Sequence, residues 1–256
     1  MKFCSLGSGS SGNCYLLSDE KETIIIDCGF NASEFERRLK RFEINPSSLT
    51  AILLTHEHDD HSKSIFSVAH KLKIPIFLTH GTYKMCHKKI TKSLQLDLRF
   101  IKCLEVFRIG NISVTPIPVP HDAREPVQFK FQSNGKIFAI ITDLGFGNKI
   151  LLNEIHHLDG LILESNHDDD LLKQSRYPKS LKDRISGMYG HLSNQESAKI
   201  LKNIDTKRLS WLGASHLSKE NNTAELVTKS WQKVLKNNLI DINIIDQDNG
   251  VNWVTL

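Results

Sequence analysis

The residues of this chain best suited to chemistry crowd into one short stretch, Thr55–His61, which reads THEHDDH. It contains His56, His58, Asp60 and His61, and it directly follows a continuous apolar run. Imidazoles and a carboxylate packed this closely are costly to bury unless a positive charge organises them. A divalent metal ion supplies that charge, and His nitrogen and Asp oxygen are among its preferred donors. The stretch therefore predicts a metal site.

Three further candidate ligands stand alone in the chain, and each follows an apolar run. His121 comes after Ile112–Val119, Asp143 after Lys136–Thr142 and His216 after Leu209–Ser215. Open α/β sheets place their sites at the carboxyl edge of the strands, so we expect these side chains to join the first four at one rim. Other histidines are assigned structural or surface positions: His70, His80, His87, His156 and His157.

Short apolar runs alternate with amphipathic stretches along the chain, which predicts mixed strands and helices. Six runs are expected to be buried strands: Thr23–Asp27, Ala51–Thr55, Ile112–Val119, Lys136–Thr142, Leu158–Glu164 and Leu209–Ser215. Helices are expected after capping boxes at Ser33/Glu36 and Ser193/Glu196, around Ile65 to Leu72, and from Thr223 to Lys236. Since no repeat or low-complexity linker divides the chain, we expect residues 1–256 to form a single α/β (α+β) domain with a layered sandwich architecture.

Composition and charge limit the class of protein. The 256 residues are 39% hydrophobic and 24% charged, and a net charge of +4 permits an anionic substrate without demanding one. The cysteines include no CxxC pair, which indicates buried thiols in a reducing compartment. The N-terminus lacks a signal-peptide core and no apolar run reaches about 18 residues, so we expect a cytoplasmic protein without a membrane span.

The motif HxHxDH, followed by a lone His, a lone Asp and a final His, resembles the metallo-β-lactamase superfamily over nearly the whole chain. The early strand that ends in Asp27, Cys28 and Gly29 is similar to a second short motif of that superfamily. The resemblance implies a four-layer αββα sandwich, the metallo-β-lactamase fold, and two divalent metal ions. The ligands it implies are His56, His58 and His121 for one ion, Asp60, His61 and His216 for the other, and Asp143 as the bridge between them.

The same resemblance implies the chemistry of the site. A hydroxide shared by two ions about 3.5–4 Å apart would be the nucleophile, and Asp60 is placed among the catalytic residues as well as the ligands. His and Asp donors without a thiolate suit Zn²⁺ and Mn²⁺ alike. An Asp at the bridging position, with a second His after Asp60, is the arrangement of dinuclear phosphodiesterases, nucleases and glyoxalase II-like thioesterases rather than of the secreted β-lactamases.

Three further segments, SLGSGSSGN, ESNHDDD and GHLSN, extend the likeness to the small YycJ/WalJ-type members of the superfamily. That type is associated with 5′-to-3′ exonuclease activity on DNA. The first segment is either an anion-binding Gly/Ser loop or a plain tight turn. From the three segments we expect substrate contacts by Ser8, Ser10, Ser11, Asn13, Asn166, His167, Ser193 and Asn194.

His191, in the GHLSN segment, is predicted to be the catalytic proton donor. Phosphodiester cleavage expels an alkoxide that must be protonated as it departs, and a histidine titrates near neutral pH. His191 also stands just before the capped helix start at Ser193, where N–H groups favour a phosphate oxygen. Similar nucleases carry a His of this GHxS type. The alternatives are a histidine that only orients the loop, and His167 as the donor.

The segment Asp168–Met188 lacks a clean periodicity and carries several basic residues: Lys173, Arg176, Lys179, Lys182 and Arg184. It is either a lid or substrate arm that holds backbone phosphates, or a solvated surface loop.

Together these features predict a metal-dependent phosphodiesterase or exonuclease that acts on nucleic acid, with DNA preferred, and they indicate no obligate protein partner. Two alternatives stay open. The first is a glyoxalase II-like thioesterase or lactonase, and the second is a non-catalytic metal-binding regulatory protein.

Overall fold

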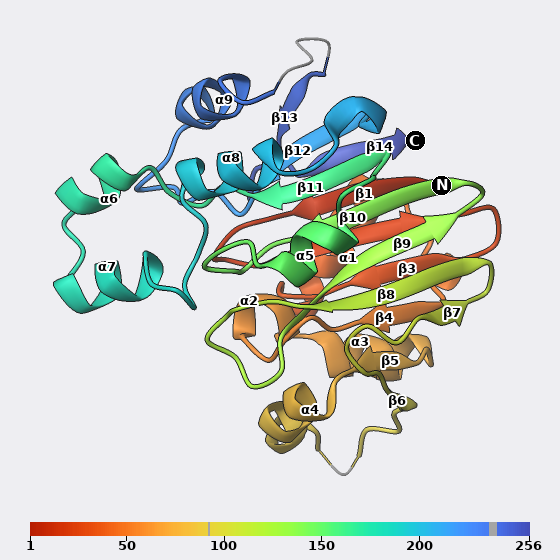
Figure 1. Cartoon of the computed structure of the whole chain (residues 1–256). Helices are drawn as coiled ribbons and strands as arrows, with labels where there is room; N and C mark the ends of the chain where they lie inside the picture. The colour runs from red at the N-terminus through yellow and green to blue at the C-terminus, as the bar shows by residue number, and fades with distance from the viewer. Residues whose placement is uncertain (92, 236–239) are drawn as a thin grey trace.

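Two mixed β-sheets lie face to face in the computed structural model, which describes residues 1–91, 93–235 and 240–256 (Figure 1). The first sheet has the order β14-β1-β2-β3-β4-β5-β6, and the second has the order β13-β12-β11-β10-β9-β8-β7. The strands of the first sheet are β1 (Lys2–Gly7), β2 (Cys14–Ser18), β3 (Thr23–Ile26), β4 (Ala51–Leu53), β5 (Ile76–Leu78), β6 (Leu98–Phe100) and β14 (Val251–Thr255). Those of the second are β7 (Phe107–Ile109), β8 (Ile112–Pro118), β9 (Val127–Ser133), β10 (Lys136–Ile141), β11 (Gly160–Glu164), β12 (Trp211–Ser215) and β13 (Ile242–Ile244).

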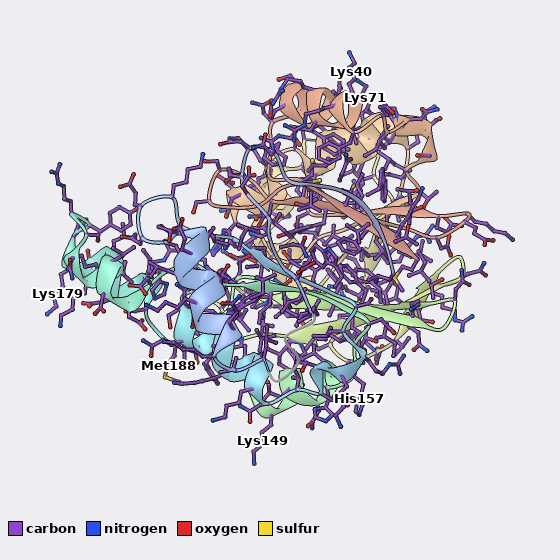
Figure 2. The ribbon with its side chains drawn as sticks, turned by 90° about the horizontal axis from the view of Figure 1, so that it is seen from above. Lys40, Lys71, Lys149, His157, Lys179 and Met188 are labelled. Carbon is purple, nitrogen blue, oxygen red and sulfur yellow. The ribbon has the colours of Figure 1, made fainter. Side chains whose placement is uncertain are left out.

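Helices lie outside the two sheets, either on their outer faces or beyond the edge of the sandwich (Figure 1). They are α1 (Ala32–Arg41), α2 (Asp59–Ser62), α3 (Ile65–Leu72), α4 (His80–Cys86), α5 (Lys149–Glu154), α6 (Asp169–Gln174), α7 (Lys179–Ile185), α8 (Asn194–Lys202) and α9 (Ala224–Gln232). Figure 2 shows the layers edge-on: Lys40 and Lys71 mark the helical layer on one side, and Lys149 and His157 mark the opposite side, with the sheets between them. The expected αββα arrangement is therefore confirmed. That residues 1–256 form a single domain stays a prediction.

Strands with both faces covered explain the continuous apolar runs of the sequence. In β3, Ile25 packs beneath the helices of the first sheet, whereas Ile24 and Ile26 face the second sheet. In β10, Ile141 packs toward α5 and α8, and Phe138 lies between the sheets. Because side chains alternate along a strand, burial on both faces needs an apolar residue at every position. All six predicted strands are confirmed, and they differ from the prediction only at their ends.

The start of α1 differs from the prediction. Asn31, not Ser33, caps this helix, and its Oδ1 accepts a hydrogen bond from the Glu34 backbone nitrogen at 2.8 Å. Ser33 lies inside the first turn and donates to Asn31, while Glu36 pairs with Lys71 of α3 at 2.6 Å. Asn is as good a cap as Ser, and its position ahead of Ala32 decides where the helix begins.

The later helix starts agree with the sequence. Ser193 caps α8 by accepting a hydrogen bond from the Glu196 backbone nitrogen, and Thr223 caps α9. Helix α9 ends at Gln232, short of the predicted end, and Lys236 itself lies outside the described residues. All five cysteines are free, and four of them are buried, which agrees with the reading of unpaired thiols.

The segment Asp168–Met188 is not a surface loop, because it forms α6 and α7. Figure 1 shows these helices projecting beyond the sandwich, and in Figure 2 Lys179 marks the outer end of the projection. We call this segment the arm. Within the described residues, none of the helices has the length and hydrophobicity needed to traverse a bilayer.

Candidate metal centre

Strands from both sheets deliver polar side chains to one rim of the sandwich. Asp27 follows β3, His56 follows β4, His121 follows β8, Asp143 follows β10, Glu164 ends β11 and His216 follows β12. Strand β3 is parallel to β4, and β10, β11 and β12 are parallel to one another. Their carboxyl ends therefore meet at one edge in each sheet, as the sequence predicted.

The first group of side chains, which we call the three-histidine cluster, consists of His56, His58 and His121. His56 Nε2 lies 3.1 Å from His58 Nδ1, and His121 Nε2 lies 3.2 Å from the same atom. Three nitrogens bound to one tetrahedral metal at about 2.0–2.1 Å would lie roughly 3.3 Å apart. The spacing of the cluster fits a metal ion, and these three residues form one of the groups able to hold one.

The second group, the four-residue cluster, consists of Asp60, His61, Asp143 and His216. His61 Nε2 lies 3.1 Å from Asp143 Oδ2 and 3.6 Å from Asp60 Oδ2. Within the described residues, Asp143 Oδ2 and His216 Nε2 are buried and make no hydrogen bond of good geometry, although His61 pairs with Asp143 by charge. Buried polar atoms rarely stay without a partner, and a divalent ion would satisfy both at once. The donor set of this cluster therefore also fits a metal ion.

The two clusters hold protons differently. Burial lowers the pKa of His56 well below its usual value, helped by the neighbouring His61. Burial would do the same to His61 and His216, but the surrounding carboxylates, Asp143 foremost, raise the pKa of both rings well above the usual value. In the same way, His216 and His61 overcome burial and hold the pKa of Asp143 well below its usual range.

Asp27 orients a ring of the four-residue cluster. Its Oδ2 lies 2.7 Å from His61 Nδ1, and it also accepts hydrogen bonds from the Thr55 backbone nitrogen at 2.9 Å and the Thr55 hydroxyl at 2.8 Å. An Nδ1–H that donates to Asp27 leaves Nε2 of His61 free toward the cluster. Carboxylates that hold metal-binding histidines in this way fix the tautomer and raise the basicity of the ring.

Glu164 performs the same task for two rings, and the sequence did not assign it a role. Its Oε1 lies 2.7 Å from His191 Nδ1 and 2.9 Å from His216 Nδ1, while Oε2 accepts from the backbone nitrogens of Leu144 and Leu192. Burial would raise the pKa of Glu164, yet the His191 and His216 contacts bring it down to about 2. The sequence signal that could have identified Glu164 was its position at the end of a buried strand, like the other residues of the site.

Unusual backbone geometry accompanies three of these strand ends. Asp27, Asp143 and His216 have φ angles of 62°, 54° and 55°, in the left-handed region that residues with a Cβ seldom adopt. Gly29 has a different reason to be small, because a Cβ there would lie 1.7 Å from the backbone oxygen of Asp60. The absence of that Cβ lets the first turn of α2, which carries Asp60, close against the end of β3.

Comparisons with known proteins agree with this geometry. A sequence model of the family described as "Beta-lactamase superfamily domain" matches residues 22–212. The chain belongs to this superfamily. Its overall structure is similar to that of the metallo-β-lactamase fold protein YhfI from Bacillus subtilis, with a TM-score of 0.78, 17% identity, and coverage of 99% of this chain and 98% of YhfI. The metallo-β-lactamase fold expected from the sequence is confirmed.

Curated relatives in the superfamily align over most of their length. Exodeoxyribonuclease YycJ of Bacillus anthracis is 32% identical over 237 residues, which cover 92% of this chain and 89% of YycJ. Exodeoxyribonuclease WalJ of Streptococcus pneumoniae serotype 2 is 31% identical over 227 residues, with coverage of 88% and 84%. The resemblance to the YycJ/WalJ type is confirmed, and the chain is a metal-binding hydrolase of the metallo-β-lactamase superfamily.

The residues expected to contact substrate occupy several kinds of position on the superfamily fold. Ser10 lines the cavity beside the two clusters. Ser8 Oγ accepts from the His216 backbone nitrogen at 3.0 Å, and Asn166 Nδ2 donates to the His216 carbonyl at 2.9 Å, so both support the end of β12.

The other residues expected to contact substrate lie elsewhere. Asn13 Nδ2 lies 3.0 Å from His61 Nε2. Ser11 is exposed, while His167, Ser193 and Asn194 are buried around the start of α8. Their contact with substrate stays a prediction.

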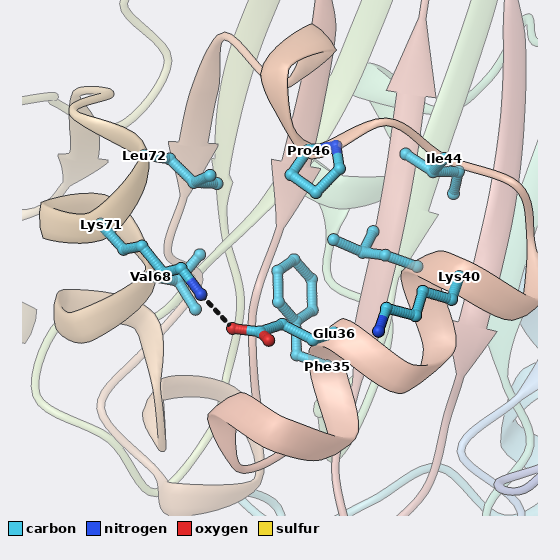
Figure 3. Close-up of a pocket in the computed structure, with 9 residues that line it drawn as sticks. Phe35, Glu36, Lys40, Ile44, Pro46, Val68, Lys71 and Leu72 are labelled. Carbon is cyan, nitrogen blue, oxygen red and sulfur yellow. Dashed lines mark hydrogen bonds and ion pairs between the residues drawn. The ribbon is translucent and has the colours of Figure 1, made fainter.

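Two pockets of this superfamily member are candidates for the site of chemistry. The cavity beside the clusters measures about 580 Å³ and is lined by histidines, carboxylates and the arm. The pocket of Figure 3, between α1 and α3, measures about 170 Å³. It has an apolar floor that includes Phe35 and Val68, and the Glu36–Lys71 ion pair crosses one side. Its lining holds no group of metal-ligating side chains, so the candidate site is the larger cavity.

Proposed function

We propose that this protein is a metal-dependent phosphodiesterase that removes nucleotides from DNA ends in the 5′-to-3′ direction. The observation that carries the proposal is the placement of the two clusters side by side, with the rings of His56 and His61 4.2 Å apart, at the floor of one open cavity. The exodeoxyribonucleases YycJ and WalJ, aligned over about nine tenths of the chain, support DNA as the substrate.

The clusters divide the ligands between two ions. His56, His58 and His121 would hold the first, and Asp60, His61 and His216 would hold the second together with Asp143. We propose that Asp143 also serves the first ion, as the sequence resemblance implies. Divalent ions there would lower the pKa of a bound water and neutralise charge on the phosphoryl oxygens. Asp60 lines the cavity, and its half-buried carboxylate would also accept a hydrogen bond from the attacking water.

His191 is placed to protonate the leaving oxygen. Its side chain is 21% exposed at the edge of the cavity, and its ring centre lies 5.1 Å from that of His216. Burial would lower the pKa of His191, but the Glu164 carboxylate on Nδ1 raises it instead. With Nδ1 directed at Glu164, the protonated ring would carry its other proton on Nε2, where it could pass to the departing alkoxide.

His167, the rival donor, is less suited to this role. Its side chain is 1% exposed, and burial lowers its pKa to about 4. The ring is therefore neutral near pH 7 and has no readily transferred proton.

The reaction class is tested with protein stripped by a chelator and reloaded with Zn²⁺ or Mn²⁺. We expect metal-dependent hydrolysis of bis-p-nitrophenyl phosphate, and of linear DNA in preference to RNA, with mononucleotides released from 5′ ends. A thioester and a lactone serve as comparison substrates. Faster turnover of the thioester or the lactone than of both diesters would replace the proposal with a glyoxalase II-like function.

The proton donor is tested separately with His191→Ala. We expect a large loss of activity on DNA and a much smaller loss on p-nitrophenyl diesters, because p-nitrophenolate leaves without protonation. Metal content, measured alongside, should not change. Loss of a metal ion would make His191 a ligand or its support, and equal losses on both substrates would make its role structural.

A further inference from the structure

Part of the lining of the cavity that holds the metal ligands is formed by the arm. Its contributions are Tyr177, Leu181, Arg184 and Ile185. Leu181 and Ile185 lie one helical turn apart on α7, so they share a face, and Tyr177 stands just before that helix. All three are half-buried. The arm therefore presents an aromatic and aliphatic wall to the ligands across a space of about 580 Å³.

Most of the basic residues of the arm lie outside the cavity lining. Lys182 donates to the backbone oxygens of Lys173 and Ser175, both at 2.7 Å, and so ties α6 to α7. Lys179 stands at the outer end of the arm (Figure 2). Arg184 does line the cavity, where its guanidinium is held by Asp122 at 2.7 Å. A surface built to track a phosphate backbone would turn several cations toward the substrate, whereas Arg184 is the one basic residue of the arm in the described lining, and it is paired with Asp122.

The arm is fixed to the rim at its C-terminal end. Besides the Arg184–Asp122 ion pair, the Asp122 backbone nitrogen donates to the Tyr189 carbonyl at 3.0 Å. A Cβ at Gly145 would lie 2.2 Å from the Met188 carbonyl, so the loop after β10 packs directly against the arm. These contacts hold the wall at a set position over the clusters, where it bounds the cavity.

A nucleotide has the two chemistries that the lining of this cavity combines. Its phosphate is an anion for the metal ligands, and its base is a flat apolar ring of the kind that stacks on aromatic side chains. A volume of about 580 Å³ lies within the range of roughly 300–1,000 Å³ in which proteins hold single small ligands. We infer that Tyr177, supported by Leu181 and Ile185, stacks on the base of the terminal nucleotide while its phosphodiester lies at the two clusters.

This inference rests on the proposed function and extends it, because it makes the arm the element that selects a nucleotide end. A wall that closes one side of the cavity favours a chain terminus over an internal position. It also assigns recognition to the base, which the five basic residues of the arm did not suggest. Tyr177 is thus a binding residue, distinct from the metal ligands.

The test begins with binding, measured by calorimetry on the zinc-loaded protein with dTMP and with 2-deoxyribose 5-phosphate, which lacks the base. We expect the wild-type protein to bind dTMP more tightly by on the order of tenfold, the usual contribution of one stacked base. Tyr177→Ala should remove this difference, and Tyr177→Phe should retain it. Tyr189→Ala is the matched control, because Tyr189 is 60% exposed and lies outside the cavity lining.

Kinetics give the second readout, with the p-nitrophenyl ester of dTMP compared with the same ester lacking thymine. The ratio of their kcat/KM values should fall toward one in Tyr177→Ala and in Leu181→Ser, while both variants keep the wild-type Tm. Equal binding of dTMP and the sugar phosphate by the wild-type protein would overturn the inference, and so would an unchanged ratio in Tyr177→Ala.

Failure of the proposed function would look different. A wild-type protein that hydrolyses neither ester with either metal, yet still prefers dTMP in calorimetry, would refute the phosphodiesterase and support the nucleotide-binding wall. A protein that cleaves both esters at equal rates, without preferring dTMP, would refute the wall and support the phosphodiesterase.

Discussion

The three-histidine cluster and the four-residue cluster lie against each other, but the pKa values of their histidines are shifted in opposite directions. The first contains no carboxylate, and burial lowers the pKa of His56 and His121. In the second, burial would also lower the pKa of His61 and His216, but Asp143 and its neighbouring carboxylates raise it. A metal ion would meet lowered-pKa rings at His56 and His121, but it would have to displace protons from the paired rings of His61 and His216, because metal ligands must be deprotonated.

The difference shows that one rim of the sandwich can hold two candidate metal sites whose ligands differ in charge and pKa. In the three-histidine cluster the nitrogens are already at metal-binding spacing. The four-residue cluster stores its charge as internal ion pairs, such as His61 with Asp143 at 3.1 Å, until an ion replaces the protons.

The largest effect is expected from Asp143→Asn, which removes the carboxylate proposed to contact both metal ions. We expect kcat on bis-p-nitrophenyl phosphate to fall on the order of a thousandfold, since metal ions contribute several kcal/mol to such reactions, and bound metal to fall from two ions toward one. Asp205→Asn is the control, because its carboxylate pairs with His157 and belongs to neither cluster. Full activity in Asp143→Asn would remove the distinction between the two clusters.

The pH dependence of metal binding should separate the clusters next. The variant His121→Ala keeps only the four-residue cluster intact, and His216→Ala keeps only the three-histidine cluster intact. Between pH 6 and 8 we expect the metal affinity of the first variant to rise roughly ten- to a hundredfold per pH unit, as one or two protons are released. The second variant should change little above pH 7. Calorimetry in buffers of different ionisation enthalpy counts the protons, and equal counts would contradict the comparison.

Asp27→Asn should weaken one cluster without removing a ligand. The Asp27–His61 contact is a support for the metal-binding ring, and losing such a support costs about 10- to 100-fold in affinity. Chelator competition should show this loss for the four-residue cluster only. Asp19→Asn, which removes a carboxylate from the turn between β2 and β3, is the control. Equal weakening of both clusters would show that Asp27 supports the rim as a whole.

The smallest effect concerns the metal-free protein. The raised pKa values of His61 and His216 mean that their stabilisation is complete below about pH 6.5 and is lost as pH rises through their folded values. The lowered pKa of His56 acts in the other direction, so stability falls as pH drops below about 6.5. We expect Tm to decrease by a few degrees from pH 7 to 9 without metal and to stay level with metal bound. A metal-free Tm that rises over this interval would contradict the assignment.

The candidate ligands could be recognised in the sequence because their signals are local. Four of the seven stand in THEHDDH, and each of the others follows a recognisable buried strand. The supporting carboxylates were harder to recognise. Glu164 reaches His216 because β11 and β12 are parallel neighbours in the second sheet, and the order of strands in a sheet is not written in the sequence of either strand.

The arm shows a second limit. Helices α6 and α7 span six and seven residues, which is too short for a helical period to stand out. Its basic residues are conspicuous in the sequence, but which side chains face the cavity depends on how α7 is docked against the rim. The wall formed by Tyr177, Leu181 and Ile185 therefore became visible only in three dimensions.

The left-handed backbone at Asp27, Asp143 and His216 has a consequence for how this protein would evolve. Each such residue costs about 1–3 kcal/mol relative to a relaxed conformation, and Gly or Asn would relieve much of that cost. At these three positions, the backbone conformation that directs the side chains into the site lowers folding stability. Laboratory evolution for heat resistance alone, with no requirement for turnover, should replace these residues early, and a descendant of that kind would melt later while it lost its metal site.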